Sequence, residues 1–152
     1  MRVYSQEDLT LLHEFPISDT FGCDGITATP DGFAVAVCRG ALKDNVSSPI
    51  YEYDRQFRLR RVHELTHRPV YAAIQCLKRR PGGGYIASLY GNLLFQLDES
   101  FRVVAEGDAD ASVGLVVEEN GGILRAVHHS QRERGWAVHL ERLSPTCLRP
   151  RR

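Results

Sequence analysis

The chain has 152 residues, which is the usual length of about one domain. Its 19 Lys and Arg residues balance 19 Asp and Glu residues, and this formal net charge of +0 argues against nucleic-acid binding. With 43% hydrophobic and 25% charged residues and no apolar run of roughly 18 residues, the composition excludes a disordered chain and a membrane span.

The first element predicted along the chain is a hairpin with an alternating apolar strand, a polar turn and a second strand, over Val3–Leu12. The same pattern recurs at Ile50–Leu59 and Leu94–Val103, and more weakly from Ala137 to Leu143. The copies start about 43 to 47 residues apart, which is typical of a repeat architecture. The alternation predicts strands that are exposed on one face.

A second kind of hairpin lies between these copies. Gly25–Val37 is predicted to form two strands joined at Pro30–Gly32, where proline fixes φ and we expect the glycine to be left-handed. The pattern repeats over Ala73–Leu89 and Gly114–Val127, each time around a glycine-rich turn. These strands are almost continuously apolar, which is typical of strands buried on both faces. No segment shows a sustained 3.6-residue period, so we predict no long helix.

The strand order is therefore an outer pair at residues 3–15 followed by three four-stranded modules at 24–65, 73–107 and 113–148, in one repeat domain over 1–152. Two segments, GITATPDGFAVAV at Gly25–Val37 and GGYIASLYGNLLFQLDESF at Gly83–Phe101, resemble β-propellers of the NHL-repeat and regucalcin/gluconolactonase-like kind. The resemblance implies an all-β fold in which each module is one antiparallel blade.

Three modules and a spare hairpin are too few to close a ring, because propellers usually close with about 4 to 8 blades. We therefore predict a partial propeller that is completed by oligomerisation, for example by two chains about a two-fold axis. The hairpin Val3–Phe15 would supply missing outer strands to its own chain or to a partner, because Pro145 interrupts the last outer strand. The alternatives are a β-trefoil, which closes as a monomer at this length, and a piece of a longer propeller.

Most of the unusual polar residues fall in loops that would share one face around the channel mouth of a propeller. Loops on a rigid scaffold are where binding groups concentrate, and Trp and Arg are enriched in binding hot spots. One such loop is predicted at His128–Trp136 and another at Ser18–Asp24. Our candidates for contacting a ligand or a partner are Asp24, Arg39, Asn45, His67, Arg68, Asp110, His128, Arg132 and Trp136.

The resemblance also implies a divalent cation, since lactonase-like propellers hold one with Glu, Asn and Asp side chains. Here Asp24 and Asn45 are the candidate ligands, and the alternative is that they are solvated loop residues that begin turns. His67, together with His128, is a candidate ligand or general base, and the alternative is a histidine hydrogen-bonded at a strand end. The sequence contains no P-loop, HExxH or GxSxG motif.

The favoured prediction is a non-catalytic binding or assembly module that forms a homodimer or binds another protein, with a small anionic or sugar-like ligand as a further candidate. The alternative is a metal-assisted, lactonase-like hydrolase, so the sequence leaves open whether the protein is an enzyme. We expect a cytoplasmic protein, because Cys38 and Cys76 lie in apolar runs without a CxxC pair and charged residues interrupt the N-terminal segment.

Overall fold

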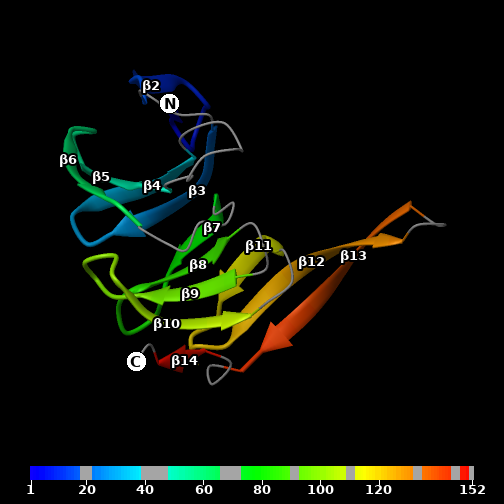
Figure 1. Ribbon diagram of the computed structural model, residues 1–152. Helices are drawn as coiled ribbons and strands as arrows, with labels where there is room; N and C mark the ends of the chain where they lie inside the picture. The colour runs from blue at the N-terminus through cyan, green and yellow to red at the C-terminus, as the bar shows by residue number, and fades with distance from the viewer. Residues whose placement is uncertain are drawn as a thin grey trace.

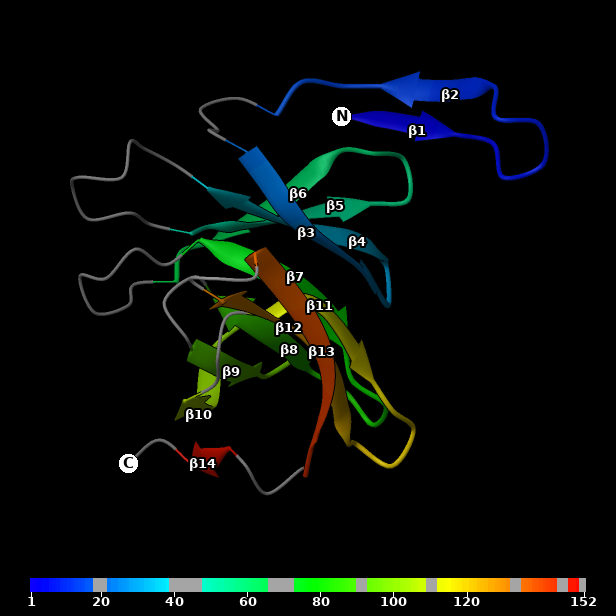
Figure 2. The same ribbon diagram turned by 90° about the vertical axis from the view of Figure 1, so that its right-hand side faces the viewer.

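The computed structural model describes residues 1–17, 22–38, 48–65, 73–89, 93–108, 112–131, 135–144 and 148–150. Its described strands form four antiparallel sheets that follow one another along the chain (Figures 1 and 2). The described residues contain no helix, which confirms the prediction of an all-β chain.

The N-terminal hairpin is a two-stranded sheet of β1 (Arg2–Tyr4) and β2 (Leu11–Glu14). The first sheet consists of β3 (Gly22–Thr29), β4 (Gly32–Cys38), β5 (Ile50–Asp54) and β6 (Leu59–His63), paired in that order. The second sheet has β7 (Ile74–Arg79), β8 (Tyr85–Leu89), β9 (Leu93–Leu97) and β10 (Val103–Asp108), with β14 (Arg149–Pro150) added at the edge of β10. The last sheet has β11 (Ser112–Val117), β12 (Ile123–Gln131) and β13 (Gly135–Leu143).

Burial is greatest in the middle strands of the sheets, which corrects two expectations. The innermost strands β3 and β7 are only partly buried, whereas β5, expected to be exposed on one face, is buried except at Glu52. All five residues of β8 are buried, and so is the middle of β4, because these strands lie between a strand on each side and a sheet on each face. By contrast, β2 and most of β6 are exposed. The continuous apolar runs therefore belong to the strands with the most neighbours.

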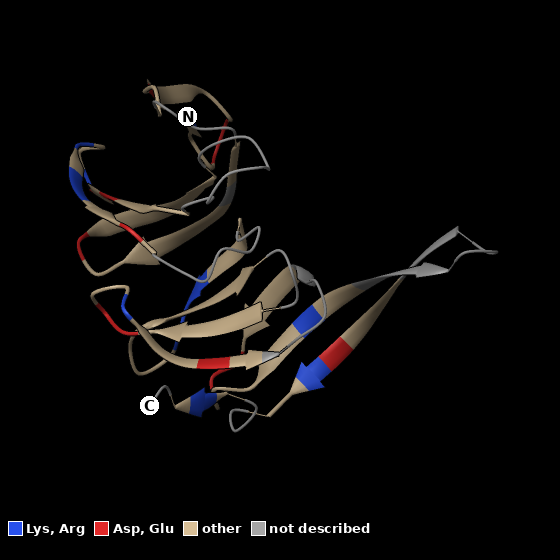
Figure 3. Ribbon diagram, in the orientation of Figure 1, with Lys and Arg blue, Asp and Glu red and all other residues tan. Residues whose placement is uncertain are grey.

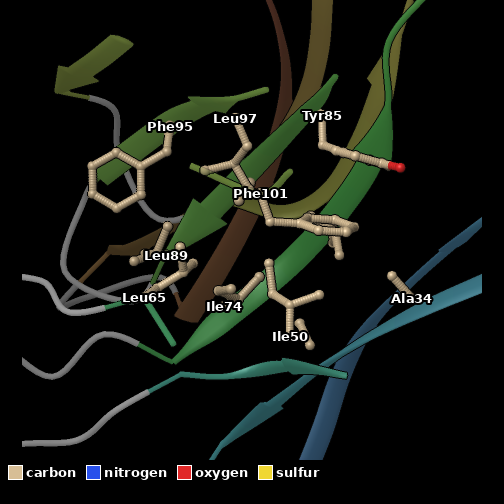
Figure 4. Packing of buried hydrophobic residues seen from close by; sticks show 12 residues of the cluster. Ala34, Ile50, Leu65, Ile74, Tyr85, Leu89, Phe95, Leu97 and Phe101 are labelled. Atoms are coloured by element: carbon tan, nitrogen blue, oxygen red, sulfur yellow. The ribbon is translucent and has the colours of Figure 1, made fainter. Parts of the chain in front are cut away.

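Three apolar layers hold the sheets together. The largest lies between the first and second sheets, and Figure 4 shows Ala34 and Ile50 of the first facing Ile74, Tyr85 and Phe101 of the second. A smaller layer between the second and last sheets is made by Ile86, Leu94, Leu115 and Ile123. The N-terminal hairpin covers the first sheet through the third layer, in which Met1, Phe15, Ile17 and Phe33 pack against Val35, Val37, Tyr51 and Tyr53.

The turn between β3 and β4 corrects one expectation. The left-handed glycines among the described residues are Gly82, Gly83, Gly84 and Gly121, and Gly32 is not one of them. A Cβ atom on Gly32 would lie 2.1 Å from the carbonyl oxygen of Tyr53. Glycine is needed here because the neighbouring strand β5 approaches the backbone closely, and not because of φ.

The turns after β5 and β9 share one hydrogen-bonding pattern. Asp54 Oδ1 accepts the backbone N–H groups of Gln56 and Arg58 at 2.9 and 3.0 Å, and Asp54 Oδ2 accepts Nε of Arg58 at 2.9 Å. Asp98 accepts the equivalent groups of Ser100 and Arg102 at 2.8 to 2.9 Å. The hydrogen bond from the backbone N–H of Arg58 is the main reason why the pKa of Asp54 lies below its ordinary value. Partial burial raises the pKa of Asp98, but the hydrogen bonds from Arg102 and Ser100 outweigh it and lower the net pKa.

Two features of the topology differ from the expected modules. The last sheet has three described strands, and the C-terminal strand β14 pairs with β10 of the second sheet, where Ala105 faces Pro150 and Glu106 faces Arg149. The N-terminal hairpin pairs with no other described strand, so it supplies no outer strand to its own chain in the described part. The described strands form separate sheets and no closed barrel, which does not favour the β-trefoil alternative.

Because Asp98 accepts hydrogen bonds in its turn as a carboxylate, we predict that the free energy of unfolding falls in acid. Because the folded state holds the pKa of Asp98 below its ordinary 3.8, the ionised carboxylate stabilises the fold above that pH, and this contribution is lost as the pH falls through the folded pKa. We expect Asp98→Asn to lower the free energy of unfolding at pH 7, and we expect its difference from the wild type to shrink below about pH 3.8. Urea unfolding at pH 7 and pH 3 measures this. The exposed Asp31→Asn is the control, and an equal difference at both pH values would contradict the prediction.

Candidate functional site

In the first and second sheets a phenylalanine at the same turn position contacts the sheet before it. Phe101 follows β9 with a φ of 59°, is 2% exposed, and places its ring 4.7 Å from His63 and 4.3 Å from Tyr85. Phe57 follows β5 with a φ of 62° and stacks on His13 at 4.6 Å. Each phenylalanine therefore reaches back from its own turn to a histidine on the outer strand of the preceding sheet.

The two histidines lie in similar four-residue sequences at the ends of their strands. His63 lies in Val62-His63-Glu64-Leu65 at the end of β6, and His13 lies in Leu12-His13-Glu14-Phe15 at the end of β2. His63 Nε2 is 3.0 Å from Oε2 of Glu52 on the neighbouring strand β5, and this contact orients the ring toward Phe101. The hairpin and the first sheet therefore present equivalent surfaces to the sheet that follows each of them.

Leu9 lies directly before the end of the hairpin turn, as Phe57 and Phe101 do in theirs, but this turn is one residue longer and the Leu9 side chain is exposed. It has a φ of 59°, and its turn is closed by a hydrogen bond of 2.8 Å from the N–H of Ser5 to the carbonyl oxygen of Thr10. The Leu9 side chain is 75% exposed, whereas its counterpart Phe101 is buried. A non-glycine residue with positive φ is uncommon and costs free energy unless neighbouring structure compensates for it.

The other end of the row of sheets is also uncovered. The strand register puts Val116, Leu124 and Arg142 in one row and Gly114, Ala126 and Leu140 in the next, all on one face of the last sheet. On this face Val116 is 57% and Leu140 is 71% exposed, and Val138 nearby is 61% exposed. The opposite face, with Leu115 and Ile123, is buried against the second sheet. We call the exposed face the outward face of the last sheet.

The first sheet is only partly covered on its N-terminal side. Ile26, Val35 and Tyr51 are aligned across β3, β4 and β5 on one face. Val35 and Tyr51 are buried under the N-terminal hairpin, but Ile26 on the inner strand is 53% exposed. The hairpin thus covers the middle strands β4 and β5 of this sheet and leaves Ile26 on the inner strand exposed.

One surface depression is not an anion site. It measures about 630 Å³ and lies at the turn between β7 and β8, lined by Arg79, Arg80, Pro81, Gly82, Gly83, Glu99 and Val117. Glu99 Oε1 already accepts the backbone N–H of Gly84 at 2.9 Å and lies 3.9 Å from Nη2 of Arg79. The position that an anion would take in this glycine turn is therefore filled by the chain's own carboxylate.

Charge does not mark out a site on the described surface either. Acidic and basic residues are interspersed, with both signs on each of the three larger sheets (Figure 3). Many of them are paired, as in Arg2–Glu14 at 3.0 Å, Arg102–Asp98 at 2.8 Å and Arg142–Glu118 at 2.8 Å. Arg125 is buried in the last sheet, where its guanidinium binds Glu141. This pattern agrees with the neutral net charge.

Most of the predicted site residues lie outside the described part of the chain. They are Arg39, Asn45, His67, Arg68, Asp110 and Arg132. The side chains of Asp24, His128 and Trp136 also lie outside it, although their backbones are described. Among the described residues no group of three His, Cys, Asp or Glu side chains is arranged to hold a metal ion. The cation site at Asp24 and Asn45 and the ligand face remain predictions.

The backbone nevertheless corrects two predicted loops. β3 begins at Gly22, so Asp24 lies in a strand, at the register shift between Cys23 and Gly25. β12 extends to Gln131 and β13 begins at Gly135, so His128 and Trp136 lie in a long hairpin, where His128 faces Val138. The loop prediction was wrong because strand pairing with a neighbour stabilises extended backbone even where the local sequence is polar.

Sequence reasoning missed the surfaces that the structure leaves uncovered. The signal was present as Leu9, Phe57 and Phe101, which are large apolar residues inside otherwise polar turns of the repeated hairpin. Such a residue either packs on a neighbouring element or remains exposed, and the sequence does not say which.

Comparison with known proteins leaves the family open. The sequence matches no protein-family model and no curated protein. No helix in the described part of the chain is long and apolar enough to cross a membrane.

The buried phenylalanine gives a direct stability prediction. Phe101→Ala removes a ring that packs on His63 and Tyr85, and we expect the free energy of unfolding to fall by about 3 kcal/mol. Phe101→Leu is the matched control, because the chain already places Leu9 in the equivalent turn, and we expect a loss of about 1 kcal/mol. Urea denaturation measures both losses. Equal losses for the two variants would contradict a role for the ring in packing the sheets.

Proposed function

We propose that this chain is a non-catalytic assembly module: part of a β-propeller in which each four-stranded sheet is a blade, which completes its ring by associating with a second copy. The observation that carries the proposal is the contrast between the sheet faces. Faces between consecutive sheets are closed by apolar layers, whereas the two end faces expose Leu9, Ile26, Val138 and Leu140.

The strand order supports the propeller part of this proposal. β3 to β6 and β7 to β10 each pair in sequence order, and in the first sheet the outermost strand β6 is the most exposed. The inner strands of consecutive sheets are also in direct contact, since Thr27 Oγ1 of β3 accepts the backbone N–H of Arg79 of β7 at 2.9 Å. Each blade of a closed propeller has another blade packed on both of its faces. In the described part of this chain, the outward face of the last sheet is exposed.

Burial of apolar surface supports the assembly part. Removing apolar surface from water contributes about 25 cal/mol per Å², and contiguous exposed apolar patches mark protein interaction sites. The exposed side chains are large and lie on rigid, hydrogen-bonded strands and turns, so little conformational entropy is lost when a partner covers them. The described part of the chain supplies no observation that favours the metal-assisted hydrolase.

The mass in solution tests the assembly. One chain is 17.1 kDa, and we expect light scattering after size-exclusion chromatography to give twice this mass at micromolar concentration. Dilution should shift the mass toward that of one chain if the end faces associate reversibly. A compact monomer at every concentration would overturn the proposal.

A metal titration tests the non-catalytic part. A cation that binds only the native state must raise the melting temperature, because the stabilisation is RT ln(1 + [L]/Kd). We expect millimolar Ca²⁺, Mg²⁺ or EDTA to leave the melting temperature unchanged within about 1 °C. A rise with one cation that EDTA reverses would contradict this prediction and revive the hydrolase alternative, with Asp24 and Asn45 as the first residues to substitute.

A further inference from the structure

We infer that the second copy docks head to tail. The N-terminal hairpin of one copy, through Tyr4, Leu9 and Leu12, would contact the outward face of the last sheet of the other, through Val116, Val138 and Leu140. This inference rests on the proposed function and names the two surfaces that would meet. All six side chains are large, apolar and exposed.

The first argument is that the chain makes this kind of contact twice within itself. Phe57 packs on His13 of the preceding hairpin, and Phe101 packs on His63 of the preceding sheet. In both cases a turn residue with positive φ contacts the outer part of the sheet before it. Leu9 also has a positive φ and also lies directly before the end of its turn, but its side chain is 75% exposed. A second copy offers a sheet of the same construction.

The second argument is that the last sheet has the complementary surface. Its outermost described strand is β13, and Val138 and Leu140 lie on that strand, two residues apart. The repeated contact places a turn residue on the outer part of the preceding sheet, so Leu9 would reach these two residues. The hairpin end contributes a turn and the last sheet contributes a face, so the contact joins two different surfaces.

The third argument is that the arginines described on the two surfaces are already paired, and that the acidic residues beside Leu9, Glu7 and Asp8, lie in the exposed turn. Arg2 is paired with Glu14 on the hairpin, and Arg142 is paired with Glu118 on the last sheet. An unpaired charge would make burial costly, whereas a charge that is already paired at the rim adds little cost. A contact between two different surfaces, made twice around a two-fold axis, closes with two copies.

The test uses two variants that each disable one surface. Leu9→Asn removes the apolar side chain but keeps the turn, because asparagine tolerates positive φ. Val138→Thr/Leu140→Thr makes the last sheet polar with residues that suit a strand. We expect each variant to remain folded by circular dichroism and to weaken dimerisation at least tenfold in sedimentation equilibrium. Val104→Thr, an exposed position on β10 of the second sheet, is the control and should dimerise as the wild type does.

Mixing the two variants distinguishes head-to-tail docking from other arrangements. In a mixed dimer the intact hairpin of one variant meets the intact last sheet of the other, so one of the two contacts is restored. We expect the equimolar mixture to associate at least tenfold more tightly than either variant alone. If Leu9→Asn dimerised normally while the threonine variant did not, the last sheets would pair with each other, and head-to-tail docking would be overturned.

Two further outcomes separate this inference from the function on which it rests. A wild-type dimer that both variants and their mixture leave unchanged would overturn the docking surfaces but not the assembly module. A wild-type protein that is monomeric throughout would overturn the assembly proposal itself, and the docking surfaces with it.

Discussion

The packing of one sheet face onto the next is the interaction on which the rest of the structure depends. Each sheet has apolar side chains on its faces and must bury them against another element, so each sheet relies on its neighbours. The close approach of β3 and β7 shows how tight this packing is, since a Cβ atom on Gly25 would lie 3.0 Å from the backbone nitrogen of Leu77. The hydrogen bond from Arg79 to Thr27 fixes the same two strands relative to each other.

The turns after β5 and β9 contribute to this packing through their phenylalanine side chains. Asp54 and Asp98 satisfy the backbone N–H groups of their turns, and this leaves Phe57 and Phe101 in the left-handed region. That conformation is unfavourable for a large side chain, and contact with the preceding sheet compensates for it. Leu9 adopts the same conformation without such a contact in one chain. A partner that covered Leu9 would therefore supply the contact that its two counterparts already have.

The two ends of the row of sheets are only partly covered by other described strands. The N-terminal hairpin covers the middle strands β4 and β5 of the first sheet and leaves Ile26 exposed, and β14 covers the edge of β10 instead of extending the last sheet. Edge strands and apolar faces of this kind are sites where proteins pair with further chains. In the proposed ring, the hairpin of each copy covers the last sheet of the other. A second copy of the same chain therefore covers both exposed end surfaces.

The sequence by itself determined the hairpins and their approximate bounds, because side-chain alternation and turn residues act over a few neighbouring positions. It did not determine that β5 is buried on both faces or that β7 is partly exposed. It did not determine that β14 pairs with β10, that Asp24 and Trp136 lie in strands, or that Arg125 is buried against Glu141. Nor did it show why residue 32 must be glycine, since the atom that excludes a Cβ belongs to Tyr53 on another strand. Which apolar side chains stay exposed on the hairpin and on the last sheet, such as Leu9 and Leu140, is likewise decided by the tertiary structure. A leucine or phenylalanine in such a turn is buried when it packs on a neighbouring sheet and exposed when it does not. Only the tertiary structure decides which of the two occurs.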